Sequence, residues 1–307
     1  TVMSNIRIIP VTTRKGLRAF VNFYYELYKG NKFAVPFLRF DEMNTLSKRK
    51  NPAFEFCEAQ YFLAVDGEAR IVGRVAAIIN RRANEQWNKK QVRFGWFDFV
   101  DDLEVSQALL NAVEAWGRTK GMTECVGPLG FTDMDREGLL IEGFHHKSTM
   151  YINYNYPYYK NHMEAMSFYE KDNDWLEYRI KVPEETPAKF ARTAEMIEKR
   201  YNLHVHKFTS RELVKGGMGR EVFHIVNETY KDLYDFQQLT DSQIDKYVND
   251  YIKKADLNLV TGVVDGNDGN RLIGFGVSFP SFTDALQKIG NGKLLPWGWL
   301  KILKVLK

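Results

Sequence analysis

Apolar residues along the first 180 positions follow two different spacings. Residues 13–30 and 102–121 place apolar side chains three and four positions apart, as a helix with one buried face does. Residues 151–159 are aromatic and lead into a further helix through Met166, and residues 175–182 are expected to form a closing strand. Short apolar runs typical of strands cover residues 6–9, 61–65, 71–79, 91–100 and 123–126. Residues 31–58 are expected to form a loop. The pattern predicts a mixed sheet flanked by helices.

Two hairpins are predicted far apart in the chain. Asp66-Gly67 joins two of the strands above, and Asp265-Gly266 joins residues 259–264 to 272–279; both dipeptides are typical of tight turns. The strands that enter these turns lie 199 residues apart, whereas the strands that leave them lie 201 apart, so the second loop is two residues longer. Each hairpin follows a strand and helices. We interpret the two as copies of one α/β unit, with chance similarity of common hairpins as the alternative.

Residues 182–187 form the best boundary between the copies. The segment is polar, contains Pro183 and Pro187, and offers Thr186 as a helix cap with proline at the first helical position. Residues 1–182 are therefore assigned to a first domain and residues 183–307 to a second. The second is expected to contain a helix to about residue 200, a strand at 203–208, a helix at 221–234, and a helix that begins with a capping box of Thr240 and Gln243.

The charge balance narrows the classes of function. The 307 residues include 43 Lys and Arg against 39 Asp and Glu, a net charge of +4. A nucleic-acid-binding protein usually has a larger and more clustered basic excess, so no nucleic-acid partner is expected. No apolar run approaches the about 18 residues of a membrane-spanning helix, and the first residues lack the apolar core of a signal peptide. We therefore expect no integral membrane segment and a cytoplasmic location.

The first domain resembles the GNAT superfamily of acyltransferases, and more closely a family of bacterial two-lobed GNAT-like proteins. Its order of strand, helix, Asp-Gly hairpin, long strand, helix, strand and helix is that of a GNAT lobe. The match covers roughly residues 5–180, and the segments that carry it are residues 51–54, 72–80, 94–97, 127–131, 137–140, 143–144 and 154–159. The resemblance implies an α/β fold of tandem GNAT-like lobes, the second of which is incomplete in this chain.

The resemblance also implies acyl-CoA as the co-substrate. GNAT enzymes usually hold its pyrophosphate with a Gln/Arg-x-x-Gly-x-Gly/Ala loop after the fourth strand, where a helix begins. The first domain has Asp101, Asp102 and Glu104 at that position, and these carboxylates would repel a pyrophosphate. The equivalent loop of the second lobe is expected after Lys307. The resemblance therefore implies that these residues are part of a longer protein and that the cofactor-binding residues follow them.

GNAT chemistry, as the resemblance implies it, is direct attack of an amine on a thioester. It needs oriented substrates and a proton acceptor but no covalent nucleophile. Tyr158 and Tyr159 precede a helix where many GNAT enzymes hold a tyrosine acid, and Glu137 lies in an acidic loop near the expected cleft. The candidate catalytic residues are therefore Glu137, Tyr158 and Tyr159. The alternatives are a loop ion pair with Arg136 and packing of the aromatic rings.

Further residues are expected to line the substrate cleft. They are Phe94, Trp96, Asp133, Asp135, Tyr154 and Asn155. Because side chains alternate along a strand, Trp96 is expected to share a face with Phe94 and Asp98 and to lie opposite Phe97.

The remaining reactive side chains fit structural roles. Cys57 and Cys125 cannot form a four-sulfur zinc site and are expected to be inert. His204 and His206 alternate on a strand without further ligands in sight, so no metal is expected. Residues 216–219 lack the Gly-Lys-Ser/Thr of a phosphate loop and are expected to form a turn. Residues 294–307 are expected to form an inserted helix of the second lobe that packs on its missing strands or on an acyl-chain cleft, with a membrane surface as the alternative.

The sequence thus favours an N-acyltransferase that moves an acyl group from acyl-CoA, or a related donor, to a small-molecule amine or amino acid. The alternative is a catalytically inert GNAT-like binding or scaffold protein, which the acidic helix start favours for the first domain. The sequence does not define the acyl length, the acceptor amine or the oligomeric state.

Overall fold

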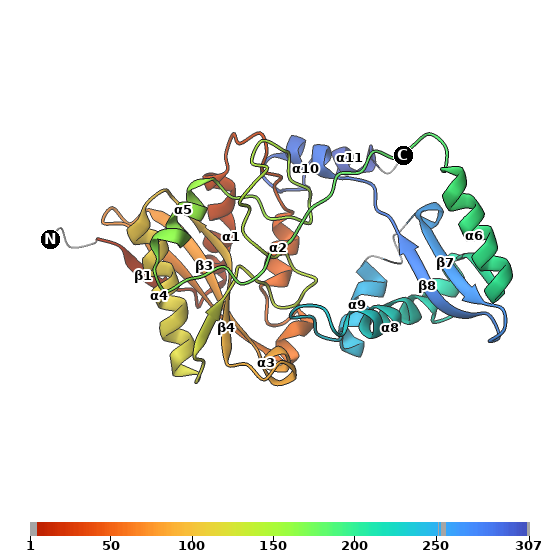
Figure 1. Ribbon diagram of the computed structural model, residues 1–307. Coiled ribbons are helices and arrows are strands. Elements are labelled where there is room, and N and C mark those ends of the chain that lie inside the picture. The colour runs from red at the N-terminus through yellow and green to blue at the C-terminus, as the bar shows by residue number, and fades with distance from the viewer. Residues whose placement is uncertain (1–4, 251, 253–255, 306–307) are drawn as a thin grey trace. The chain divides into compact units, whose positions relative to one another are not determined.

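The computed structural model describes residues 5–250, 252 and 256–305, and these form two compact units (Figure 1). The first unit combines the chain up to Asp174 with the segment from Pro280 onward, and the second covers Trp175–Phe279. The boundary expected at residue 182 lies a few residues inside the second unit. The segment from Pro280 differs from expectation, because it packs with the first unit instead of the second.

The first unit is built on a five-stranded mixed sheet in the order β1-β2-β3-β4-β5. Its first four strands pair antiparallel, whereas β5 runs parallel to β4. The strands are β1 (Arg7–Pro10), β2 (Cys57–Val65), β3 (Ile71–Asn80), β4 (Gln91–Phe99) and β5 (Glu124–Val126). The expected mixed α/β class is therefore confirmed.

Helices cover both faces of this sheet (Figure 1). On one face, α1 (Arg14–Leu27) buries an aromatic stripe against β2 and β3, and Thr13 caps it by accepting the N–H of Gly16. On the other face, α4 (Leu103–Thr119) buries an aliphatic stripe against β3 and β4, next to α5 (Tyr158–Ala165). The shorter helices of the unit are α2 (Arg39–Thr45), η1 (Pro52–Glu55), α3 (Arg81–Gln86), α10 (Thr283–Ile289) and α11 (Gly298–Leu303).

The second unit has a three-stranded antiparallel sheet in the order β6-β7-β8. Its core lies between this sheet and two helices, α8 and α9. The capping box expected at Thr240 and Gln243 is present, with hydrogen bonds of 2.9 and 3.3 Å in the two directions. The elements are α6 (Ala188–Tyr201), β6 (Leu203–Lys207), α7 (Ser210–Val214), α8 (Met218–Tyr230), α9 (Asp241–Asp250), η3 (Leu257–Leu259), β7 (Val260–Asp265) and β8 (Arg271–Val277).

The two hairpins occupy equivalent places in the two sheets, which confirms the predicted repeat. The hairpin β2–β3 pairs with β1 on the free edge of β2, and the hairpin β7–β8 pairs with β6 on the free edge of β7. The register also shifts at equivalent points, where the pairing skips Val72 in β3 and Ile273 in β8. A register shift at equivalent positions of two hairpins is hard to attribute to chance, since a β-bulge is a specific feature of the local backbone.

Two local expectations are wrong. Residues 175–182 form no strand, because their β-prone side chains find no neighbouring strand to pair with; Leu176, Tyr178, Ile180 and Val182 are 74–81% exposed. Residues 31–58, which the sequence suggested to be a loop, contain the helix α2. This helix has too few apolar residues to produce a helical period in the sequence. Tertiary packing stabilises it, so it is recognised only in the folded structure.

No helix among residues 5–250, 252 and 256–305 is long and apolar enough to cross a bilayer.

Two leucines of α4 test the packing of the first unit. Leu109 is fully buried between α4 and the sheet, whereas Leu103 on the same helix is 41% exposed. Leu109→Ala is expected to lower the free energy of unfolding by about 2–5 kcal/mol through cavity formation, and Leu103→Ala by less than about 1 kcal/mol. Urea unfolding of both variants measures the difference, and equal losses would contradict the assigned face of α4.

Candidate functional site

The strand β4 contains a bulge at Trp96. Arg74 of β3 lies opposite Asp98, but Ala76 lies opposite Gly95, so Trp96 and Phe97 together face a single residue of β3. Trp96 has a φ of +45°, in the left-handed region that bulky residues rarely enter. Such a conformation costs about 1–3 kcal/mol and persists only where its surroundings enforce it. The strained position therefore marks this part of β4 as a candidate site.

The bulge changes which side chains share a face. Trp96 and Asp98 lie on the side of α1, whereas Phe94, Phe97 and Phe99 lie in the core on the side of α4. The expected separation of Trp96 from Phe97 is confirmed, and so is the shared face of Trp96 and Asp98. The expectation that Phe94 shares that face is wrong, because strict alternation fails where one extra residue is inserted.

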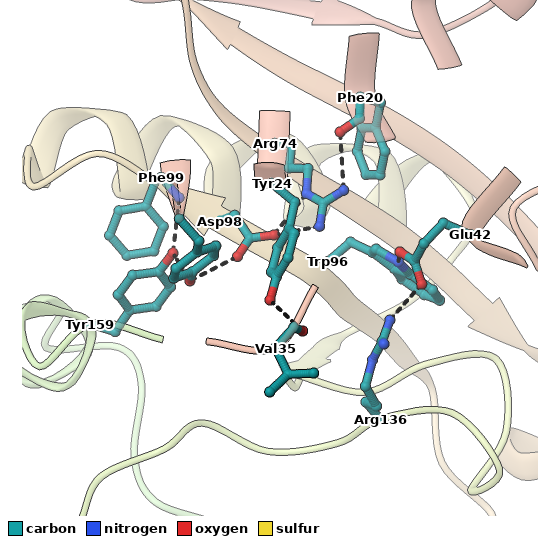
Figure 2. Close-up of polar contacts among 11 residues, drawn as sticks. Phe20, Tyr24, Val35, Glu42, Arg74, Trp96, Asp98, Phe99, Arg136 and Tyr159 are labelled. Atoms are coloured by element: carbon teal, nitrogen blue, oxygen red, sulfur yellow. Dashed lines mark hydrogen bonds and ion pairs between the residues drawn. The ribbon is translucent and has the colours of Figure 1, made fainter. Parts of the chain in front are cut away.

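A buried ion pair lies directly beyond the bulge (Figure 2). Both Nε and one terminal nitrogen of Arg74 are 2.7 Å from Oδ2 of Asp98, and the guanidinium also donates to the carbonyl of Phe20 in α1 at 3.0 Å. The Arg74 side chain is only 2% exposed. Burial alone would lower the pKa of Arg74, but the charges of Asp98 and Glu42 outweigh it and leave the pKa raised. Arg74 therefore stays charged, and its contacts link β3, β4 and α1.

Two tyrosines extend this network. Tyr28 at the end of α1 donates its hydroxyl hydrogen to Oδ1 of Asp98 at 3.1 Å, and its oxygen lies 3.2 Å from the hydroxyl of Tyr159. The hydroxyl of Tyr159 also accepts the backbone N–H of Phe99 at 3.2 Å. Burial raises the pKa of both Tyr28 and Tyr159, so both hydroxyls stay protonated. Tyr159, a candidate catalytic residue, lies in this network and is 1% exposed.

Tyr158, the second candidate tyrosine, is half-buried beside it. Its hydroxyl donates to the carbonyl of Phe99 at 2.5 Å. Burial, together with the nearby charges of Asp98 and Asp101, raises its pKa. Both tyrosines thus bind the backbone at the end of β4, on opposite sides of the same residue. These two hydrogen bonds hold the end of the strand in place.

A second buried carboxylate lies on the other side of the bulge (Figure 2). Glu42 of α2 accepts the indole N–H of Trp96 at 2.8 Å, and its other oxygen lies 2.6 Å from a terminal nitrogen of Arg136. The Glu42 side chain is 8% exposed, whereas that of Arg136 is 18% exposed. The Arg136 guanidinium also stacks over the ring of Phe37. Trp96 and Arg136 are therefore the partly exposed groups of this cluster.

The acidic loop after β5 carries three of the predicted residues. Asp135 folds back under the loop and accepts the N–H groups of Phe131 and Thr132 at 2.8 and 3.3 Å. Burial raises the pKa of Asp135 above its ordinary value despite these hydrogen bonds. Asp133 and Glu137 are half-buried in the same loop. The loop is held to β3 by Asn80, whose amide donates to the carbonyl of Phe131 at 2.7 Å.

Two other predicted cleft residues are largely buried. The Asn155 side chain accepts the N–H of Leu140 at 2.7 Å and donates to its carbonyl at 3.0 Å, which pairs two loop segments like a short ladder. The Tyr154 hydroxyl donates to the carbonyl of Phe144 at 3.2 Å. Tyr154 and Asn155 are 6% and 5% exposed. Both therefore hold the loop that leads into α5, and their role in a cleft stays a prediction.

Carboxylate side chains of the protein itself lie at the N-terminus of α4, and one of them caps the helix. Asp102 caps the helix and accepts the N–H of Glu104 at 2.9 Å. Asp101 lies 3.0 Å from Nε2 of His162, whose Nδ1 lies 2.9 Å from the buried hydroxyl of Ser106. The first N–H groups of the helix thus face a carboxylate of the protein. This arrangement does not fit the binding of a pyrophosphate at this helix.

Sequence reasoning missed three charged residues of the site. Arg74 and Asp98 lie on strands predicted correctly, but their pairing depends on the bulge, which alternation does not reveal. Glu42 lies in the segment taken as a loop, 94 residues from its partner Arg136. A charged residue inside an otherwise apolar strand, as Arg74 is, was the one local signal available, because a buried charge needs a partner.

The described residues contain no group of three or more His, Cys, Asp or Glu side chains that could hold a metal ion. Of residues 216–219, expected to be a turn, Gly216 and Gly217 lie between α7 and α8, with Gly217 at a φ of +84°, whereas Met218 and Gly219 begin α8.

The topology and the repeated hairpin define a two-lobed GNAT-like fold, with four antiparallel strands, a parallel fifth strand and helices on both faces in the first lobe. No protein-family model matches the chain. The chain is 27% identical to protein YghO of Escherichia coli K12 over 301 residues, 96% of this chain and 73% of that protein. It is 26% identical to the bacterial ceramide synthase of Caulobacter vibrioides over 310 residues, 99% of this chain and 77% of that protein.

Among solved structures, a tandem GNAT protein from the clavulanic acid biosynthesis pathway matches 89% of this chain and 75% of its own, at 13% identity and a TM-score of 0.42.

The Arg74–Asp98 pair yields a stability prediction. Asp98→Asn is expected to lower the free energy of unfolding by about 3–5 kcal/mol, because it leaves a buried guanidinium without its counter-charge. Combining it with Arg74→Met should recover most of that loss. The exposed pair of Arg118 and Glu114 on α4 is the control, where Arg118→Ala should cost less than about 1 kcal/mol. Urea unfolding tests this, and a loss for Asp98→Asn as small as that of the control would contradict it.

The two thiols yield a prediction about reactivity. Burial raises the pKa of both Cys57 and Cys125 to about 12. Both should therefore stay protonated and react with iodoacetamide at pH 8 far more slowly in the folded protein than in urea. Because unfolded thiols lose their protons near pH 8.5, stability should decline as the pH rises from there toward 12. Equal labelling rates with and without urea would contradict the burial of these side chains.

Proposed function

We propose that the protein is a GNAT-type acyltransferase that moves an acyl group from an acyl thioester to an amine. The similarity to a bacterial ceramide synthase along 99% of the chain supports this and suggests the class of acceptor. A ceramide is the amide of a fatty acid and a long-chain amino alcohol. The proposed donor is therefore a long-chain acyl-CoA or a related thioester, and the proposed acceptor is a long-chain amine.

The observation that carries the proposal is the strained bulge at Trp96 between two buried carboxylates. GNAT chemistry needs no nucleophile from the protein, and both thiols are protonated at neutral pH. It needs instead a rigid frame that holds two substrates in position. The network on both sides of Trp96 supplies such a frame, because each of its buried charged groups already has a protein partner.

A proton must leave the amine as its nitrogen attacks. The nitrogen forms a bond to the thioester carbonyl carbon, the carbon–sulfur bond breaks, and the sulfur leaves as the thiolate. A carboxylate takes the proton from the nitrogen and passes it to the thiolate, which gives the thiol. The loop with Asp133, Asp135 and Glu137 is the proposed source of that carboxylate. Asp135 is the first to test, because a raised pKa improves a carboxylate as a proton acceptor near neutral pH. Tyr158 and Tyr159 are proposed to position this end of β4.

The phosphates of the donor are proposed to bind away from the start of α4 in the first lobe. The cap by Asp102 and the carboxylates of Asp101 and Glu104 argue for this placement. The same feature favours the alternative function, a GNAT-like binding protein without catalysis. In that case the protein would bind a long-chain amine and form no amide.

The test is amide formation by the full-length protein, measured by mass spectrometry with palmitoyl-CoA and a long-chain amino alcohol. Asp135→Asn keeps the loop hydrogen bonds and should slow the reaction by about 10²–10⁴-fold, with Asp133→Asn and Glu137→Gln compared beside it. Glu104→Gln on α4 is the control and should leave the rate unchanged. Binding of the amine without amide formation from any acyl thioester would support the binding-protein alternative instead.

A further inference from the structure

The segment 293–305, which we call the Trp/Lys segment, exposes an unusual number of large apolar side chains. Leu295 is 77% exposed and Trp297 is 71% exposed. In α11, Trp299, Leu300 and Leu303 are each about 40% exposed. An isolated exposed apolar residue needs no explanation, but five within nine positions form a patch.

All charged residues of the Trp/Lys segment are lysines. Residues 285–307 contain five lysines and no aspartate or glutamate. Lys293, Lys301 and Lys304 are exposed. In a helix, Leu300 and Lys304 lie one turn apart on the same side, so the apolar arc of Trp299, Leu300 and Leu303 borders directly on the lysines. Apolar and aromatic side chains with lysines at their border are typical of segments that lie in a membrane interface.

The base of this segment is anchored to the first unit. The N–H of Arg39 donates to the carbonyl of Gly292 at 2.9 Å, and the Gln287 side chain donates to the carbonyl of Lys32 at 2.6 Å. A Cβ atom at Gly292 would lie 2.3 Å from the carbonyl oxygen of Phe37, so the backbone segments around Gly292 and Phe37 are in direct contact. Residues after Gly292 therefore leave from a firm attachment, and α11 turns Gly298 toward Ile289 of α10.

We propose that the Trp/Lys segment docks the protein on the surface of an anionic lipid bilayer. The indoles and leucines would enter the interface between headgroups and acyl chains, and the lysines would face the anionic headgroups. The charge of the segment selects this partner, because the lysines of residues 285–307, without a single acid among them, favour an anionic surface over a purely apolar contact with another protein. The proposal stands independently of the proposed acyl transfer.

The test is sedimentation of the full-length protein with vesicles of phosphatidylcholine alone or with about 30% phosphatidylglycerol. The anionic vesicles are expected to bind at least about tenfold more protein, and added salt should reduce this binding. Lys293→Gln with Lys304→Gln should weaken it by about 25-fold, at about fivefold per lysine. Trp297→Ser with Leu300→Ser should abolish it without changing urea unfolding, since both side chains are exposed.

Matched controls come from the same unit. Lys48→Gln with Arg49→Gln removes two exposed charges elsewhere, and Phe168→Ser removes an apolar side chain that is 94% exposed. Neither control should change binding to anionic vesicles. Equal binding to both kinds of vesicle, or none to either, would overturn the proposal. A dimer that Trp297→Ser with Leu300→Ser converts to a monomer, without vesicle binding, would identify the patch as a contact between two copies and overturn it as well.

Discussion

The bulge in β4 is the constraint on which the candidate site depends. If side chains alternated strictly from Phe94 onward, Asp98 would point into the apolar core beside α4, and Arg74 would lie on the opposite face with no counter-charge. Each of these buried charges alone would cost several kcal/mol. The bulge instead places Asp98 on the face of α1 beside Arg74, where the hydroxyl of Tyr28 and the carbonyl of Phe20 complete their hydrogen bonds.

The energies explain why Trp96 tolerates a positive φ. The strain costs about 1–3 kcal/mol, whereas breaking a buried ion pair costs about 3–5 kcal/mol. Trp96 is held on two sides. Asp98, two residues further along the strand, is fixed by Arg74, and Glu42 accepts the indole N–H of Trp96. Glu42 in turn pairs with Arg136, so one strained residue joins α2, β4 and the loop after β5. This rigidity is what a site that only orients substrates requires.

The parts that the sequence predicts well depend on short-range signals. Thr13, Asp102 and the capping box of Thr240 act within three residues, and the two Asp-Gly turns close their hairpins locally. The bulge has no such signal: Gly95 would adopt a positive φ more easily than Trp96, yet the strain lies on the tryptophan. The Glu42–Arg136 pair joins positions 94 residues apart, so no local pattern could reveal it.

The two copies of the repeat differ at the position of the buried Arg74. Aligning the two hairpins by their glycines, Gly73 with Gly274, makes Phe275 the counterpart of Arg74. Phe275 packs against the apolar core of the second unit, where a guanidinium would have no place. The two copies share one backbone arrangement. The first has a buried charged residue at this position, whereas the second has an apolar side chain. The ion pair is thus no requirement of the β1–β3 framework, since the second copy forms the same hairpin and register shift without it.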